Sequence, residues 1–171
     1  MDEIRVPIYL ITGFLESGKT TFLNFTLQQD YFYIEGKTLL ILCEEGEEEY
    51  DMEALKLANT VVEVIEKEED LTTERLSAMD IIHQPERVIV EYNGMWLASK
   101  FEKMKKPEGW GIEQEITCVD ASTFQMYMNN MKSLFWIWRA MRIWLFSTDA
   151  EQEIRWLPIA EASKLPTSGR K

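Results

Sequence analysis

Residues 13–20 read Gly-Phe-Leu-Glu-Ser-Gly-Lys-Thr, which fits the pattern G-x-x-x-x-G-K-[ST] at every fixed position. This run follows an apolar stretch typical of a buried strand, residues 6–11, and leads into a stretch with helical spacing, residues 20–29. Between a strand and a helix, a glycine-rich loop can turn several backbone N–H groups inward toward a phosphate. The alternative is a chance match in a glycine turn, and the flanking elements argue against it. The sequence therefore predicts a phosphate-binding loop.

The side chains of this loop suggest how it would hold a nucleotide with Mg²⁺. Lys19 would reach the β- and γ-phosphates, and the hydroxyl of Thr20 would bind Mg²⁺. The residues expected to bind the nucleotide are Gly13, Glu16, Ser17, Gly18, Lys19, Thr20 and Thr21.

The rest of the chain alternates apolar runs with helical patterns. Further strands are expected at residues 38–43, 61–65, 87–91 and 116–120. Helices are expected at residues 52–58, 72–82 and 121–133, the second of them capped by Thr72 and ended by Pro85. This order predicts an α/β P-loop NTPase with a mainly parallel sheet and helices on both faces.

Composition narrows the function classes. The chain of 171 residues carries 30 acidic and 18 basic side chains, a net charge of −12, which disfavours nucleic acid as a partner. The longest apolar stretch, residues 134–146, contains two arginines and is too short to span a bilayer. The first residues show no signal peptide, and two distant cysteines do not form a disulfide framework. A cytoplasmic location without membrane attachment is expected.

The sequence of the loop and its flanks is more specific than the pattern G-x-x-x-x-G-K-[ST]. Residues 11–21 resemble the opening of the CobW family of P-loop GTPases, relatives of the HypB and UreG metallochaperones. The family usually has Gly where this chain has Glu16. Residues 43–47, Cys-Glu-Glu-Gly-Glu, followed by Asp51, resemble the family's Asn-Glu-Phe-Gly-Glu switch loop. This resemblance implies that Glu44 lies near Mg²⁺ and the γ-phosphate.

A second segment extends the resemblance. Residues 87–94 resemble the family's hydrophobic strand ending in Glu-x-x-Gly. The resemblance implies that Glu91 holds Mg²⁺ or its water and that Gly94 presents its N–H to the γ-phosphate. Lys19, Glu44 and Glu91 are then the expected catalytic residues. Thr20, Glu44 and Glu91 are the expected Mg²⁺ ligands.

The family likeness implies GTP binding and hydrolysis, delivery of a metal such as Zn²⁺ or Co²⁺, and a client metalloprotein. However, the family's Cys-x-Cys-Cys motif and its guanine-specific Asn-Lys-x-Asp motif are both absent. Two alternatives therefore stay open. One is a nucleotide-dependent switch that acts on a partner without carrying metal, and the other is a P-loop ATPase or kinase. The sequence does not indicate the oligomeric state.

Other polar residues have simpler explanations. The glutamates at residues 47–49 are expected to form a solvated acidic loop, with an entry site for divalent cations as the alternative. His83 is expected to be a structural histidine and Cys43 a core residue. Asp120, in a Cys-Val-Asp-Ala run that resembles the family's Val-Val-Asp-Ala, is expected to cap a helix.

The last segment, residues 136–171, differs from the rest. It contains four of the six tryptophans and carries a charge of +2, which leaves −14 on residues 1–135. If one base was lost after the Phe135 codon, residues 135–150 can be back-translated in the restored frame as FVDMARNADMVIFNRC, which contains the family's Ala-Asp-Met-Val-Ile-Phe-Asn strand. Residues 1–135 are therefore interpreted as a partial nucleotide-binding domain with an incomplete sheet, and residues 136–171 as a poorly ordered frameshift product. The chain is then expected to bind nucleotide weakly or to be inactive. A genuine amphipathic tail is the alternative.

Overall fold

The computed structural model describes residues 3–44, 46 and 49–120, and the backbone of residues 143–146. The described residues form a six-stranded sheet in the order β3-β2-β4-β1-β5-β6, in which every neighbouring pair is parallel. The strands are β1 (Val6–Thr12), β2 (Thr38–Leu42), β3 (Thr60–Val64), β4 (Arg87–Glu91), β5 (Trp110–Asp120) and β6 (Ile143–Phe146). The predicted α/β class with a parallel sheet is confirmed.

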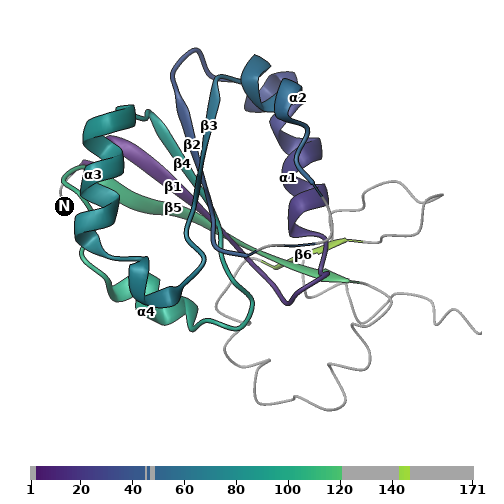
Figure 1. The fold of residues 1–171 in the computed structure, drawn as a ribbon. Coiled ribbons are helices and arrows are strands. Elements are labelled where there is room, and N and C mark those ends of the chain that lie inside the picture. The colour runs from purple at the N-terminus through teal and green to yellow at the C-terminus, as the bar shows by residue number, and fades with distance from the viewer. Residues whose placement is uncertain (1–2, 45, 47–48, 121–142, 147–171) are drawn as a thin grey trace, which may run out of the picture.

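Helices cover both faces of the sheet, as expected for parallel strands joined by helical crossovers (Figure 1). On one face lie α1 (Lys19–Leu27) and α2 (Met52–Leu57), and on the other α3 (Thr73–His83) and α4 (Ala98–Lys103). Two short 3₁₀ turns, η1 (Asp30–Phe32) and η2 (Glu68–Asp70), lie in the connections. Helix α4 was not predicted from the sequence.

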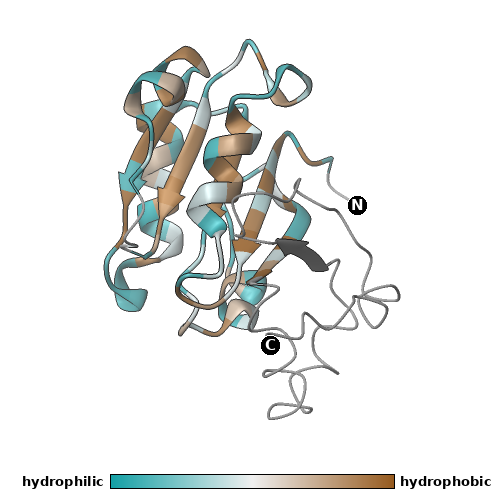
Figure 2. Cartoon of the chain, turned by 90° about the vertical axis from the view of Figure 1, so that its right-hand side faces the viewer, coloured by the Kyte–Doolittle hydropathy of each residue, from teal (hydrophilic) through white to brown (hydrophobic). Residues whose placement is uncertain are grey.

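Each face has its own hydrophobic cluster, because alternate residues of a buried strand point to opposite faces. Ile8 and Leu10 pack with Leu76 and Met79 of α3, whereas Ile11 packs on the opposite face with residues of α1. The strands carry mostly hydrophobic residues, as Figure 2 shows. No helix within the described residues has the length and apolar character needed to cross a membrane.

Helix α3 shows how local sequence sets its boundaries. The Thr72 hydroxyl accepts a hydrogen bond from the Arg75 N–H at 3.2 Å, which confirms the expected cap. The helix ends where Gln84 takes a left-handed conformation (φ 48°), directly before Pro85. The predicted and observed ends therefore differ by one residue.

Strand β5 begins six residues earlier than the sequence suggests, at Trp110 instead of residue 116. Its polar stretch at residues 113–115 hides the strand pattern. Pairing with β1 nevertheless runs from Val6 to Thr12, with one irregularity between Ile8 and Tyr9. Because β1 offers backbone partners along its whole length, tertiary pairing overrides the local polarity.

The sheet does not end at β5. We expected the sheet to lack its last strand. That expectation is wrong, because the backbone of β6 pairs in parallel with residues 117–120 of β5. The apolar, strand-favouring sequence of β6, Ile-Trp-Leu-Phe, suits this position. The helix expected at residues 121–133 lies outside the described residues.

Candidate functional site

The candidate site lies at the carboxyl ends of three adjacent strands. The sheet order places β4 between β2 and β1, so the loops that leave these strands meet at one edge. The loop after β1 contains the phosphate-binding motif, the loop after β2 contains Glu44, and β4 ends at Glu91. Ligands of open α/β sheets bind at such an edge.

The two glycines of the loop meet strict steric requirements. Gly13 has φ 140°, and a Cβ there would lie 2.4 Å from the carbonyl oxygen of Cys118. Gly18 has φ 85° and is the N-cap of α1. Both conformations are easily adopted only by glycine. They let the loop turn tightly into the N-terminus of α1, where backbone N–H groups favour an anion.

Glu16 also takes a left-handed conformation, with φ 60°. Its side chain is exposed to solvent. The family's usual Gly is the residue that adopts this conformation at the lowest energetic cost. The substitution therefore leaves strain in the backbone of the loop.

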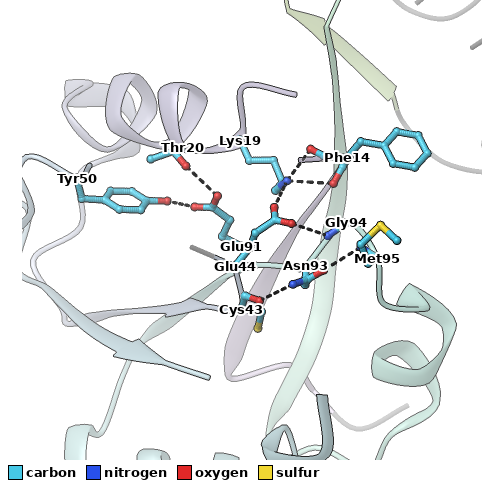
Figure 3. Close-up of polar contacts among 11 residues, drawn as sticks. Phe14, Lys19, Thr20, Cys43, Glu44, Tyr50, Glu91, Asn93, Gly94 and Met95 are labelled. Atoms are coloured by element: carbon cyan, nitrogen blue, oxygen red, sulfur yellow. Dashed lines mark hydrogen bonds and ion pairs between the residues drawn. The ribbon is translucent and has the colours of Figure 1, made fainter. Parts of the chain in front are cut away.

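The Lys19 side chain makes several polar contacts within the loop and with the loop after β2 (Figure 3). Its ammonium group donates to the carbonyl oxygens of Gly13 and Phe14, at 3.0 and 2.8 Å, and it lies 2.6 Å from a carboxylate oxygen of Glu44. The side chains of Lys19 and Glu44 are only 3% and 8% exposed. At this depth a broken pair leaves an uncompensated buried charge, so the two groups hold each other strongly.

The other carboxylate oxygen of Glu44 accepts a hydrogen bond from the backbone N–H of Gly94, at 3.4 Å. Glu44 therefore bridges the Lys19 ammonium group and the Gly94 amide. Asn93 links the segments after β2 and β4 next to this contact. Its side-chain N–H donates to the carbonyl oxygen of Cys43 at 3.1 Å, and its side-chain oxygen accepts from the Met95 N–H at 2.9 Å. The Glu44 carboxylate thus binds the Lys19 ammonium group and the Gly94 amide. These are two of the groups expected from the sequence to bind the γ-phosphate.

Glu91 is buried beside α1. One oxygen accepts a hydrogen bond from the Thr20 hydroxyl at 2.9 Å, and the other accepts one from the Tyr50 hydroxyl. Burial raises the pKa of Glu91, although its hydrogen bonds with Tyr50 and Thr20 and the nearby Lys19 charge act in the opposite direction. Thr20 and Glu91 together present oxygen donors of the kind that Mg²⁺ prefers.

The Ser17 hydroxyl indicates that the loop can bind a further polar group. It is 5% exposed, and its hydroxyl is buried without a hydrogen-bond partner among the described residues. Such a hydroxyl normally has a partner. A phosphate oxygen in the cradle of the loop would supply one, so the residues present fit a nucleotide.

Several expected residues have structural roles. Asp51 caps α2, because its carboxylate accepts from the N–H groups of Glu53 and Ala54. His83 contacts Glu63 at 2.8 Å, in agreement with its structural interpretation. The Cys43 thiol is buried, and burial together with Glu91 and Glu44 raises its pKa to about 12, which opposes thiolate formation.

The remaining expected residues are placed as follows. The Asp120 side chain and most of the acidic loop at residues 47–49 lie outside the described residues. Among those described, no group of three or more His, Cys, Asp or Glu side chains could hold a metal ion. Tyr50 and Asn93 were missed as site residues. Asn93 lies inside the quoted Glu-x-x-Gly run, whereas nothing in the sequence pattern singles out Tyr50.

Comparison with known families agrees with this geometry. The family described as CobW/HypB/UreG, nucleotide-binding domain, matches residues 7–153. The chain belongs to this family. The matched range covers the loop, Glu44, Glu91 and Gly94. It also extends past residue 135, so the CobW/HypB/UreG match includes the first part of the tryptophan-rich segment.

Among solved structures, the chain is similar to FlhF complexed with GMPPNP and Mg²⁺, at 14% sequence identity and a TM-score of 0.53. The alignment covers 90% of this chain and 60% of that one, so this CobW/HypB/UreG member spans less than two thirds of the FlhF chain. The likeness supports the P-loop fold. No match was found among curated proteins.

Proposed function

We propose that this chain binds and hydrolyses GTP with Mg²⁺, in a role linked to the delivery of a metal or metal cofactor to a client metalloprotein. One observation carries the nucleotide part of the proposal. The donors of Lys19, at the start of α1, and Gly94, in the segment after β4, converge on a single anion, the Glu44 carboxylate.

A γ-phosphate would take the place of that carboxylate. It carries more negative charge than Glu44 and can accept hydrogen bonds from both the Lys19 ammonium group and the Gly94 amide. Glu44 would then be released from both contacts. Because Glu44 lies in the loop after β2, nucleotide binding would move this loop and so present a different surface to a partner.

Thr20 and Glu91 would hold Mg²⁺ or its bound water, and the ion supplies charge neutralisation at the phosphates. For this, the Thr20 hydroxyl must turn away from Glu91, and Glu91 must be ionised. The Tyr50 hydroxyl supports the ionised form, because its hydrogen bond lowers the Glu91 pKa against the effect of burial.

The central test is Lys19→Ala, with thermal unfolding measured in the presence and absence of Mg²⁺-GTP. With nucleotide in large excess over its Kd, we expect the wild-type chain to gain several degrees and the variant to gain none. Lys103→Ala, an exposed substitution on α4, should behave as wild type. An unchanged nucleotide shift in Lys19→Ala would refute the proposal.

Lys19→Ala leaves Glu44 buried without its cation, so the variant is expected to lose stability as well. The double variant Lys19→Ala with Glu44→Ala removes both charges and should recover part of that loss. If the double variant folds and still shows no shift with Mg²⁺-GTP, the missing response reflects the lost phosphate contact and not unfolding.

Base preference and metal delivery need separate experiments. Competition between GTP and ATP for a fluorescent analogue distinguishes the GTPase from an ATPase or kinase. Family membership alone supports the metal role. The missing Cys-x-Cys-Cys motif favours the second candidate, a switch that acts on a partner without carrying metal. Phosphate release that rises with Zn²⁺ or Co²⁺ would support metal handling, and an unchanged rate would support the switch.

A cytoplasmic location belongs to the same proposal and is supported by the two cysteines, which are both free and buried. We also propose that residues from about 136 onward are read in a shifted frame. The back-translated string, which contains the family's Ala-Asp-Met-Val-Ile-Phe-Asn strand, supports this proposal. Sequencing the coding DNA tests this directly, and nucleotide binding by the frame-restored chain shows whether the change matters.

A further inference from the structure

Tyr50 reaches the site from the far end of the loop after β2, shortly before α2 begins. Its ring packs against the hydrophobic cluster that includes Phe22 and Leu23 of α1. Its hydroxyl donates to one carboxylate oxygen of Glu91, and the other oxygen accepts from the Thr20 hydroxyl at 2.9 Å (Figure 3). Each Glu91 oxygen therefore has its own partner, so the two contacts fix which oxygen faces Thr20.

Asn24 of α1 holds the backbone on both sides of Tyr50. Its side-chain N–H donates to the carbonyl oxygen of Glu49 at 3.1 Å, and its side-chain oxygen accepts from the Asp51 N–H at 3.4 Å. Asn24 lies four residues after Thr20, on the same face of the helix. The helix that carries Thr20 therefore also sets the position of Tyr50.

Glu91 needs such support because it is buried and because burial opposes its charged form. The Tyr50 hydroxyl is a neutral donor, so it stabilises the carboxylate without adding a positive charge that would repel Mg²⁺. Hydrogen-bond partners behind a metal ligand normally set both its orientation and the affinity of the site for the ion. The contact between Tyr50 and Glu91 has this form.

We propose that Asn24 and Tyr50 are positioning residues that orient Glu91 for Mg²⁺. The Tyr50 hydroxyl stays on its Glu91 oxygen, and the other oxygen faces the ion or its bound water once the Thr20 hydroxyl turns away. Since Asn24 anchors the far end of the loop to α1, the Glu44 end is the part that moves when nucleotide binds. This inference rests on the proposed binding of nucleotide with Mg²⁺.

Titration of a fluorescent GTP analogue, with and without Mg²⁺, separates this role from a general effect on folding. Tyr50→Phe keeps the ring in the hydrophobic cluster and removes the hydroxyl. We expect its nucleotide affinity in EDTA to stay within about twofold of the wild-type value. The Mg²⁺ concentration that gives half-maximal tightening should rise about tenfold. Tyr33→Phe, an exposed substitution, should match wild type in both measurements.

Asn24→Ala tests whether the two residues act as one unit. It frees the backbone around Tyr50, so the Mg²⁺ requirement should rise several-fold. The double variant Asn24→Ala with Tyr50→Phe should need no more Mg²⁺ than Tyr50→Phe alone, because Asn24 acts through the Tyr50 hydroxyl. Gln28→Ala, an exposed change at the end of α1, should leave the requirement unchanged.

Several results would overturn the inference. A wild-type Mg²⁺ requirement in Tyr50→Phe would show that the hydroxyl has no role, and a lower one would make Tyr50 a competitor of the ion. Equal losses of affinity with and without Mg²⁺ would indicate a purely structural role, and additive effects in the double variant would separate Asn24 from Tyr50. If the wild-type chain binds nucleotide, these results refute this inference alone. A wild-type chain that binds none refutes the proposed function as well.

Discussion

At the scale of single residues, Glu16 is a position where the chain departs from its family and the backbone shows the consequence. Its φ of 60° is costly for a residue with a Cβ, by about 1–2 kcal/mol. We predict that Glu16→Gly raises the free energy of unfolding by about 1 kcal/mol, as measured by urea denaturation. Glu66→Gly, an exposed loop position outside the left-handed region, should lower it instead. Equal effects at both positions would contradict the strain argument.

Glu44 leads to a second prediction at this scale. Because its carboxylate holds the Lys19 ammonium group, an incoming phosphate must first break that pair. Glu44→Gln keeps the shape but removes the charge, so nucleotide affinity measured in EDTA should rise about tenfold, the effect of one charge-assisted hydrogen bond. Fluorescent-nucleotide titration measures this. Glu49→Gln, an exposed change in the same loop, is the control. Unchanged or weaker affinity in Glu44→Gln would show that Glu44 does not compete.

At the scale of elements, the site depends on how closely the segment after β4 approaches the phosphate-binding loop. A Cβ at Gly94 would lie 2.4 Å from the Gly13 carbonyl oxygen and 2.8 Å from the Phe14 Cα, and both atoms belong to backbone. Gly94→Ala must therefore displace one of the two loops. We predict that nucleotide affinity falls at least tenfold, which titration would measure.

Gly36→Ala is the matched control for this substitution. The three atoms nearest to its Cβ would all belong to the side chain of Glu86, which can move aside. We expect nucleotide affinity to stay at the wild-type value in Gly36→Ala. If both alanine variants bind nucleotide as wild type does, the contact between the two loops is not a requirement of the site.

At the scale of the whole molecule, the pH dependence of stability follows from buried carboxyls. Burial, with Glu102 nearby, raises the pKa of Glu115 from 4.5 to about 7. Between these values the folded chain retains a proton that the unfolded chain has released, so stability falls as pH rises from about 4.5 to 7. Glu91, whose pKa burial also raises, contributes with the same sign.

Glu115→Gln removes one titrating group, so the loss of stability between pH 4.5 and 7 should be smaller by about 1–2 kcal/mol. This is less than the pKa shift alone would give, because the side chain is only partly buried and solvent screens its charge. Urea denaturation across this pH range measures the change. Glu113→Gln, an exposed substitution on the same strand, should keep the wild-type slope. A slope that Glu115→Gln leaves intact would assign the pH dependence to other groups.

Much of the molecule could be predicted from local sequence. The phosphate-binding loop, the strand Arg87–Glu91 and the cap of α3 at Thr72 all agree with the structure. Each depends on residues within a few positions of one another. The polar start of β5 and the short helix α4 were missed, because backbone pairing and packing against distant segments stabilise them more than their own sequences do.

The sequence by itself determined the kind of protein: strand, glycine loop and helix follow from steric and hydrogen-bonding rules that act between neighbours. Tertiary structure decided which groups meet. Glu44 and Gly94 are 50 positions apart, and Tyr50 and Glu91 are 41 apart, yet each pair is in contact. The placement of β4 between β2 and β1 brings them together. That strand order depends on burial of apolar residues that lie far apart in the chain, so no local pattern encodes it.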